Sequence, residues 1–232
     1  MKTSAKPIRR AARTRTSPHA SGPRLGTRGR PEQSRASILK AAVAEFAELG
    51  IAGARTDAIA GAAHVNKALL YYYFKDKDAL YEAVLDHVFG GLQHRVMPVL
   101  DSQQPPRQKM LEYLGTYFDY IAANPRFPRV VQAEWMRSGG KGSAPMRRVA
   151  RRYFRPIFAK LVEVLREGIA AGEFRPVNPM DFLPSVAAVI VFYFAAAPVM
   201  KTLLRVDPLS EQRIRERRAF VLDFISAALF VG

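Results

Sequence analysis

The sequence contains no cysteine, so it excludes disulfides, thiolate catalysis and cysteine-ligated zinc. No apolar segment lies near the N-terminus, which argues against a secretory signal peptide. The longest apolar run, residues 186–200, has fifteen residues and includes a proline at position 198. It is too short to span a bilayer. We therefore expect a soluble, cytoplasmic protein with no membrane partner.

Acidic residues are absent from positions 1–31, which hold nine of the 36 Lys and Arg residues. The formal net charge of +16 is thus unevenly placed and indicates a polyanionic partner, either nucleic acid or an anionic membrane. Residues 1–32 are rich in Pro, Gly, Ser and Arg without periodicity, which predicts a disordered basic arm. The same composition also fits an organelle transit peptide.

Sustained strand alternation is also absent, whereas apolar residues recur with helical spacing along most of the 232 positions. The predicted fold class is all-α, with about nine helices. Gly50 is expected to end the first helix, Pro98 to end the fourth, and Thr56, Asn66 and Asp76 to cap the second, third and fourth. The predicted helices span residues 34–50, 56–63, 67–74, 77–98, 107–123, 125–137, 145–171, 179–204 and 208–230.

The short second and third helices are separated by a three-residue turn, residues 64–66, and follow a longer first helix. This arrangement predicts a helix-turn-helix, although similar corners occur in many small helical domains. On the third helix, Leu70 and Phe74 share an inner apolar face. Tyr71 and Tyr72 flank the small Ala68 on the outer side of the helix, where we expect the side chains to be exposed.

An outward-facing pair of tyrosines is consistent with a DNA-reading helix, because phenol hydroxyls can donate to phosphates while Ala68 allows close approach. Lys67 could reach a guanine edge or a phosphate, and Leu69 could touch a thymine methyl. Tyr73 lies at the boundary of the face. Lys77 opens the fourth helix, where backbone N–H groups also attract phosphate. Alternatively, the tyrosines are partly buried packing residues and the lysines are solvated.

Residues 34–89 resemble the DNA-binding domain of the TetR/AcrR family of transcriptional regulators. The resemblance rests on "ILKAAVAEFAELG" followed, in the right order and spacing, by "IAGAAHVNKALLYYYFKDKDAL". It implies an all-helical homodimer with a variable C-terminal domain that binds a small-molecule effector. It also implies DNA contacts at Thr56, Asn66, Lys67, Ala68, Leu69, Tyr71, Tyr72, Tyr73 and Lys77.

His64 departs from the family pattern, which usually has glycine in this turn. Histidine can adopt the left-handed conformation at modest cost, so we expect the turn to survive. Upstream, "RGRP" (residues 28–31) resembles the core of an AT-hook, in which Arg28 and Arg30 would enter a narrow minor groove. A plain basic linker explains these four residues equally well.

The C-terminal half is less informative, although "NPRFPRVVQAEW" resembles the sixth-helix region of many family members. Aromatic side chains could line a cavity for a small, largely apolar ligand, or could be ordinary core. Glu134 could bind a ligand cation or form a salt bridge with an arginine. The last two helices are apolar enough to form a four-helix dimer interface. The candidate ligand-binding residues are Tyr113, Tyr117, Tyr120, Glu134, Trp135, Phe154, Phe158 and Phe192.

Gly90 and Gly91 lie in the middle of the fourth helix, where each glycine lowers helix stability by roughly 1 kcal/mol relative to alanine. They could form a soft point that lets a ligand change the spacing of the DNA-reading heads, or could allow close helix packing. The sequence supports both interpretations.

These features predict a basic arm (1–32), a DNA-binding domain (33–78) and a ligand-binding and dimerisation domain (79–232). The predicted function is a repressor released from a palindromic DNA operator by a small molecule. A non-specific DNA-coating protein is an alternative. A metal-dependent enzyme is a weaker one, because His87 and His94 stand about 10 Å apart along the helix, too far to share one ion. We expect no enzyme activity, no cofactor and no metal.

Overall fold

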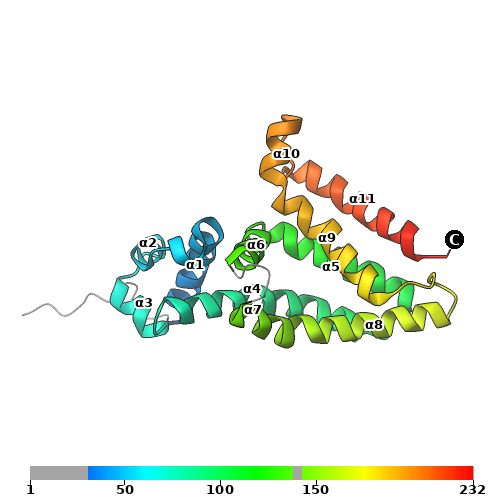
Figure 1. The fold of residues 1–232 in the computed structure, drawn as a ribbon, viewed down its shortest axis with the longest axis horizontal. Coiled ribbons are helices and arrows are strands. Elements are labelled where there is room, and N and C mark those ends of the chain that lie inside the picture. Colours follow the sequence, from blue (N-terminus) through cyan, green and yellow to red (C-terminus); the bar gives the residue numbers. More distant parts are fainter. Residues whose placement is uncertain (1–30, 138–142, 232) are drawn as a thin grey trace, which may run out of the picture.

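The computed structural model describes residues 31–137 and 143–231, which are helical apart from connecting loops and one antiparallel bridge between Phe174 and Phe230 (Figure 1). The predicted all-α class is confirmed. Its α-helices are α1 (Pro31–Gly53), α2 (Thr56–Ala62), α3 (Lys67–Tyr73), α4 (Lys77–Leu100), α5 (Pro106–Ala123), α6 (Phe127–Arg137), α7 (Ala144–Val149), α8 (Arg155–Ala170), α9 (Pro179–Ala195), α10 (Ala197–Leu204) and α11 (Glu211–Leu229).

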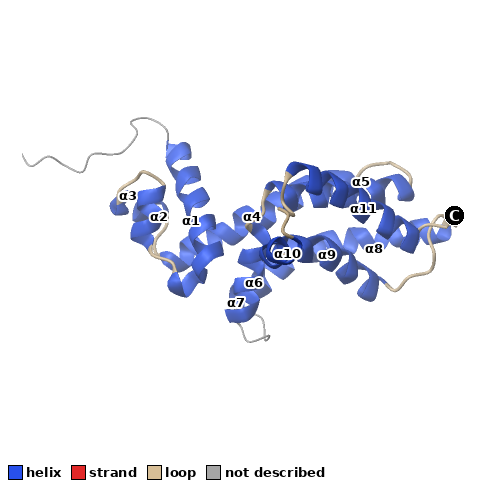
Figure 2. Ribbon diagram, turned by 90° about the horizontal axis from the view of Figure 1, so that it is seen from above, coloured by secondary structure: helices blue, strands red, loops and turns tan. Residues whose placement is uncertain are grey.

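Helices α1–α3 form one end of the molecule and α5, α8, α9 and α11 form the other, with α4 running between them (Figures 1 and 2). Ile38, Ala42 and Phe46 on α1 are buried in the core that α1 shares with its neighbours. Gly50 breaks the helical geometry of α1 with φ 63° and ψ 177°. The predicted stop is therefore confirmed, and residues 51–53 form a further helical turn beyond the kink.

Helix α4 carries the apolar stripe that connects the two ends. The side chain of Asp76 caps it by accepting the Ala79 N–H at 2.7 Å, as predicted. The stripe is buried against α1, α5 and α8, and its members are Leu80, Val84, Val88, Leu92 and Val96. The predicted end at Pro98 is wrong, because α4 continues to Leu100. Pro98 is exposed and removes a single amide donor near the helix end, so the last turn tolerates it.

Helices α7 and α8 join through a π-helical turn, Ala150–Phe154, to make one continuous helix. Pro156 has no amide hydrogen, so the carbonyl of Arg152 lacks its normal partner four residues later. The Gln93 side-chain amide on α4 donates to that carbonyl at 3.4 Å. The Gln93 side chain thus satisfies the Arg152 carbonyl and connects the long helix to α4.

The predicted helix over residues 179–204 is wrong in one respect: it breaks at Ala196 into α9 and α10, which bend by 60°. Pro198 cannot donate to the carbonyl of Phe194, so the helix ends and restarts with the proline in its first turn. Helix α10 consequently projects from the body of the molecule (Figure 1).

Close packing explains Gly91, whereas Gly90 has room for a side chain. A Cβ on Gly91 would lie 2.6 Å from the Tyr120 hydroxyl oxygen, which donates to the carbonyl of Val88 at 2.5 Å. A Cβ on Gly90 would lie 3.4 Å from the ring of Tyr153, an ordinary contact. Of the two interpretations left open above, the structure favours close packing.

We therefore expect Gly91→Ala to lower the free energy of unfolding by about 1–3 kcal/mol, because Tyr120 must move. Gly90→Ala, the matched control, should be neutral or stabilise by up to about 1 kcal/mol through helix propensity. Urea denaturation monitored by circular dichroism measures both. Tyr120→Phe removes the clashing oxygen, so the loss in Gly91→Ala should shrink in the double variant. Equal effects of the two alanines would contradict this packing.

Candidate DNA-binding and ligand-binding sites

The turn between α2 and α3 is held by backbone hydrogen bonds around a left-handed residue. His64 has φ 55°, its N–H donates to Gly61 O, and the Val65 N–H donates to Ala60 O, both at 3.0 Å. This pair of bonds is the Schellman arrangement that closes a helix C-terminus. The expectation that the turn survives with histidine is confirmed.

Helix α3 begins and is anchored as the sequence predicts. The Asn66 side chain accepts the Leu69 N–H at 2.7 Å, which satisfies one of the free donors of the first turn. Leu70 and Phe74 are buried in the core shared with α1 and α2, and the Arg35 guanidinium lies 5.3 Å from the centre of the Phe74 ring. The anchoring fixes which face of α3 is turned outward.

The outward face carries the tyrosines. Tyr72 is 80% exposed and Tyr71 is 40% exposed, while Tyr73 is half-buried and packs edge-on against Tyr72 at 5.3 Å. The Tyr71 hydroxyl lies 3.2 Å from the Thr56 hydroxyl on α2. Tyr71 is thereby held in position, whereas Tyr72 is free to meet an external partner.

Lys67 at the start of α3 forms an ion pair with Asp57 on α2, with 2.8 Å between Nζ and Oδ1. The hydrogen bond from Lys67 holds the pKa of Asp57 below its ordinary value, and the same bond raises the pKa of Lys67. Both side chains are at least half exposed, so the pair is weak and a phosphate can compete for the ammonium. Sequence reasoning missed Asp57, because only the fold brings it within reach of Lys67.

Lys77 bridges α4 and the segment before α2, since its ammonium donates to Ala54 O at 3.3 Å. It occupies the first position of α4, where the backbone N–H groups point outward. Asn66, Lys67 and Ala68 are exposed and Lys77 is partly exposed, so these predicted contact residues share the surface around α3.

Two predicted DNA contacts do not fit the structure. Leu69 is only 8% exposed, so its side chain cannot read a base edge. The prediction failed because a helical-wheel projection of α3 alone does not include the elements that pack against α3. Thr56 is buried and bonded to Tyr71, and it does not cap α2, because Arg55 is the N-cap. Arg28 and Arg30 lie outside the described residues.

The predicted ligand-binding aromatics are mostly core. Tyr113 and Tyr117 are neighbours at 5.9 Å and are buried, and burial raises the pKa of both phenols. Burial also raises the pKa of Tyr120 to about 12. Phe158 is partly buried against the core, whereas Phe154 is exposed and packs edge-on against the buried Phe89 at 5.1 Å.

Phe192 was predicted to line a ligand cavity, and this is wrong because its side chain is 72% exposed. Helix α9 is apolar on most of its circumference, so sequence periodicity could not identify its buried face. The side chain of Trp135 lies outside the described part of the structure.

Glu134 is fully buried and links three helical segments. The Tyr81 hydroxyl on α4 donates to Oε2 of Glu134 at 2.6 Å, and the Ser143 hydroxyl beside α7 donates to Oε1. Its carboxylate is therefore engaged in interactions within the protein rather than presented to a ligand cation.

Cavities in the described C-terminal part include two whose linings contain none of the eight predicted ligand-binding residues. The larger, about 440 Å³, lies among α9, α10 and α11 and is lined by residues including Met200, Leu204 and Phe220. The smaller, about 270 Å³, lies between the α4–α5 loop and α8 and is predominantly polar. Over residues 31–137 and 143–231, no three His, Asp or Glu side chains gather as metal ligands.

Within the same described ranges, no single helix is long and apolar enough to cross a membrane. The bent pair α9–α10 meets the length and hydropathy requirement only when its two helices are taken together.

The sequence matches two family profiles. Residues 38–84 match "Bacterial regulatory proteins, tetR family", and residues 106–225 match "Tetracyclin repressor-like, C-terminal domain". The second match covers half of the chain. The chain therefore belongs to the TetR family, which consists of DNA-binding transcriptional regulators and not of enzymes.

Similar proteins agree with this assignment. The HTH-type transcriptional repressor SCO4008 of Streptomyces coelicolor is 31% identical over 75% of this chain and 84% of its own length. The HTH-type transcriptional repressor NicS of Pseudomonas putida is 25% identical over 83% of this chain and 90% of its own. The solved structure of HlyIIR, a hemolysin II transcriptional regulator, aligns with a TM-score of 0.65 and 27% identity over 88% of this chain and all of that one.

The burial of Leu69 predicts that Leu69→Ala lowers the free energy of unfolding by about 2–3 kcal/mol, through lost apolar contacts. Tyr72→Ala, on the same helix but exposed, should change stability by less than about 0.5 kcal/mol. Chemical denaturation of the two variants tests both. Similar losses would mean that Tyr72 is also a packing residue.

Proposed function

We propose that this protein is a homodimeric repressor that inserts α3 into the major groove of each half of a palindromic operator. One observation carries the proposal: the capped and anchored α3 presents Tyr72 almost fully exposed beside Lys67 and Ala68. A large aromatic exposed on a short basic helix is costly unless a partner covers it. SCO4008 and NicS are named repressors, which supports repression rather than activation.

On this proposal, the DNA-binding unit is residues 33–78 and the ligand-binding and dimerisation unit is residues 79–232. Tyr72 and Lys77 contact phosphates, while Lys67 leaves Asp57 to reach a base edge or a phosphate. The basic arm of residues 1–32, with Arg28 and Arg30, adds phosphate or minor-groove contacts. We infer that such a regulator acts on the chromosome in the cytoplasm.

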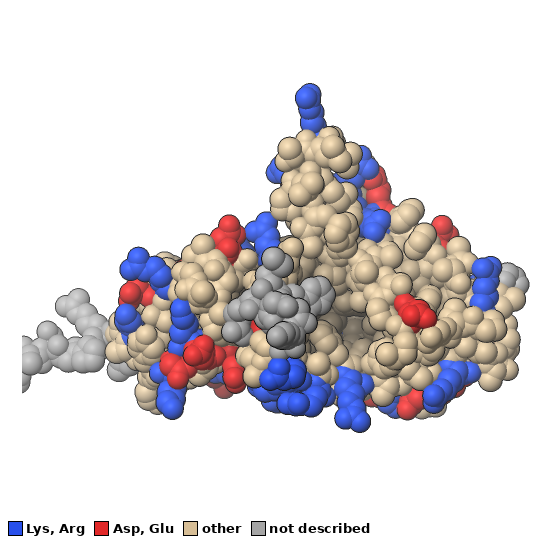
Figure 3. Space-filling view, viewed as in Figure 1, with Lys and Arg blue, Asp and Glu red and all other residues tan. Residues whose placement is uncertain are grey.

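Dimerisation is proposed through α9, α10 and α11. These helices expose a set of large apolar side chains, and the projection formed by α10 carries few charges on the face in view (Figure 3). The set comprises Phe192, Val199, Leu203, Leu204, Phe220 and Phe224. A monomer rarely exposes so much apolar surface in one region, so a second copy of the chain is the natural cover.

Effector control is proposed to act through α4, because this helix reaches from Lys77 beside α3 to the polar cavity at Leu100. Helix α6 adds a second connection, since Arg129 pairs with Glu48 on α1 at 3.1 Å. A ligand weakens DNA binding only if it prefers the arrangement in which the two α3 helices are misplaced. Typical couplings are about 1–3 kcal/mol.

Tyr72→Phe, which removes only the hydroxyl, should weaken DNA binding roughly threefold to tenfold on operator and unrelated DNA alike, because a phosphate contact is lost. Asp57→Asn should tighten binding to all DNA, because it releases Lys67 and removes a negative charge. Fluorescence anisotropy with labelled duplexes measures both effects.

The controls for this experiment are Tyr153→Phe, whose hydroxyl donates to Asp86 Oδ1 outside α3 and outside α9–α11, and Glu112→Gln on the exposed side of α5. Both should bind DNA as the unmodified protein does. If Tyr72→Phe binds DNA with wild-type affinity, the proposed contact between the Tyr72 hydroxyl and a phosphate is wrong. A footprint that shows uniform protection, and not one protected palindrome, would contradict the repressor function and favour a non-specific DNA-coating protein.

Phe220→Glu should convert the dimer to a monomer, because it places a charge among the exposed apolar residues of α11 beside Phe224, whose ring stacks on Phe220 at 5.8 Å. Light scattering after size exclusion gives the mass. Glu112→Gln again serves as the control. A Phe220→Glu protein that remains dimeric would place the interface elsewhere.

A further inference from the structure

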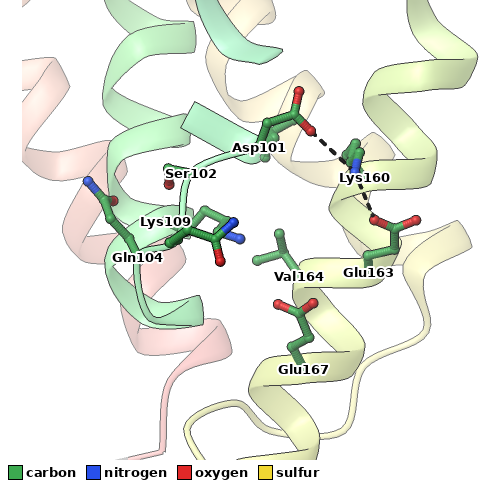
Figure 4. Close-up of a pocket in the computed structure, with 10 residues that line it drawn as sticks. Asp101, Ser102, Gln104, Lys109, Lys160, Glu163, Val164 and Glu167 are labelled. Atoms are coloured by element: carbon green, nitrogen blue, oxygen red, sulfur yellow. Dashed lines mark ion pairs between the residues drawn. The ribbon is translucent and has the colours of Figure 1, made fainter. Parts of the chain in front are cut away.

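The polar cavity at the far end of α4 has the features of a built binding site. Its wall on one side is the end of α4 and the following loop, residues 100–104, together with Lys109 of α5. The other wall is α8, which contributes residues between Lys160 and Glu167 (Figure 4). At about 270 Å³ it suits a small metabolite rather than a drug-sized molecule.

Several polar groups of this cavity have no protein partner. The Ser102 hydroxyl and the Gln104 carbonyl oxygen are buried without a hydrogen bond from the chain. Lys109 is only 8% exposed, and over the described residues its ammonium makes no ion pair or hydrogen bond. Burying such groups is unfavourable unless a ligand or an ordered water bonds them.

Lys160, by contrast, is already neutralised. Its ammonium lies 3.2 Å from Asp101 and 3.3 Å from Glu163 (Figure 4). The hydrogen bond to Asp101 is the main cause of the raised pKa of Lys160, and the hydrogen bond to Glu163 is the second. Lys109 is therefore the cation available to a ligand. Glu167 extends from α8 toward the loop and has no ion pair in the described structure (Figure 4).

We propose that this cavity binds a small zwitterion, an amino acid with a carboxylate and an ammonium group. The carboxylate meets Lys109 and the Ser102 hydroxyl, and the ammonium meets Gln104 and Glu167. A simple anion would face the uncompensated Glu167, and a simple cation would face the unpaired Lys109. Only a ligand with both charges satisfies both walls. Leu100 and Val164, which also line the cavity, accommodate its methylene groups.

The position of the site gives it a regulatory role, and this part rests on the proposed repressor function. Residue 100 is the last of α4, whose first residue, Lys77, lies beside α3. A ligand that draws the α4–α5 loop toward α8 changes the setting of α4 against α8. The DNA-binding end of α4 moves with it.

Isothermal titration calorimetry of the full-length protein near pH 7 tests the site with glycine, β-alanine, 4-aminobutyrate and 6-aminohexanoate. The series varies the distance between the two charges and so measures the spacing that the site accepts. At least one member should bind at least tenfold more tightly than butyrate and butylamine, which each lack one charge. Equal binding of butyrate, or no binding in the series at millimolar concentration, overturns the proposal.

Lys109→Met and Glu167→Gln should each weaken the best member of the series at least tenfold. Lys40→Met and Glu112→Gln, exposed positions outside the cavity, should leave its binding unchanged. Glu167 is exposed, so Glu167→Gln keeps the test valid even if replacement of the buried Lys109 impairs folding. Equal losses in the control variants overturn the assignment of the site.

Operator titrations separate the site from the repressor function. Addition of the bound amino acid should change DNA affinity about 5–150-fold. Unchanged DNA affinity despite binding overturns the regulatory role and leaves the site intact. If the protein binds the operator but binds no amino acid, the proposed ligand site is wrong and the proposed repressor function stands.

Discussion

The position of the DNA-reading surface depends on one side chain, Tyr81, which lies one turn into α4. Its ring packs edge-on against Phe46 of α1 at 5.1 Å, and its hydroxyl donates to the buried Glu134 of α6 at 2.6 Å. The phenol thus joins the helices around α3 to the C-terminal domain through an apolar and a polar contact. Because Glu134 is fully buried, its carboxylate requires these donors, and the joint tolerates little independent movement of α1, α4 and α6.

Local sequence signals predicted much of the DNA-binding end. The cap at Asn66 and the left-handed turn at His64 follow from interactions within a few residues along the chain. Leu69 was mispredicted because its burial depends on neighbouring elements, which a helical wheel does not contain. Asp57 was missed for the same reason, since it lies ten positions from the lysine with which it pairs.

The C-terminal half follows the opposite pattern, because its function depends on contacts between distant segments. Aromatic residues such as Tyr113 and Tyr117 were predicted to be ligand contacts, but they are buried and pack between helices. The polar cavity instead joins the loop around Ser102 to Glu167 on α8, and neither segment has a sequence pattern typical of a binding site. Only the folded chain shows that Lys109 is buried without a partner.

The packing of Gly91 limits how a signal can pass along α4. Tyr120 on α5 fits against Gly91 and donates to Val88 O, so the middle of α4 is held where a hinge would need freedom. On the regulatory role proposed above, a displacement of the far end of α4 is transmitted by a tilt of the whole helix together with α1 and α6, because Tyr81 joins these helices. Since α3 is connected to α4 by only three residues, 74–76, the proposed tilt would also change the direction of Tyr72. In a dimer that must fit two half-sites at once, a small change at each α3 is sufficient to lower DNA affinity.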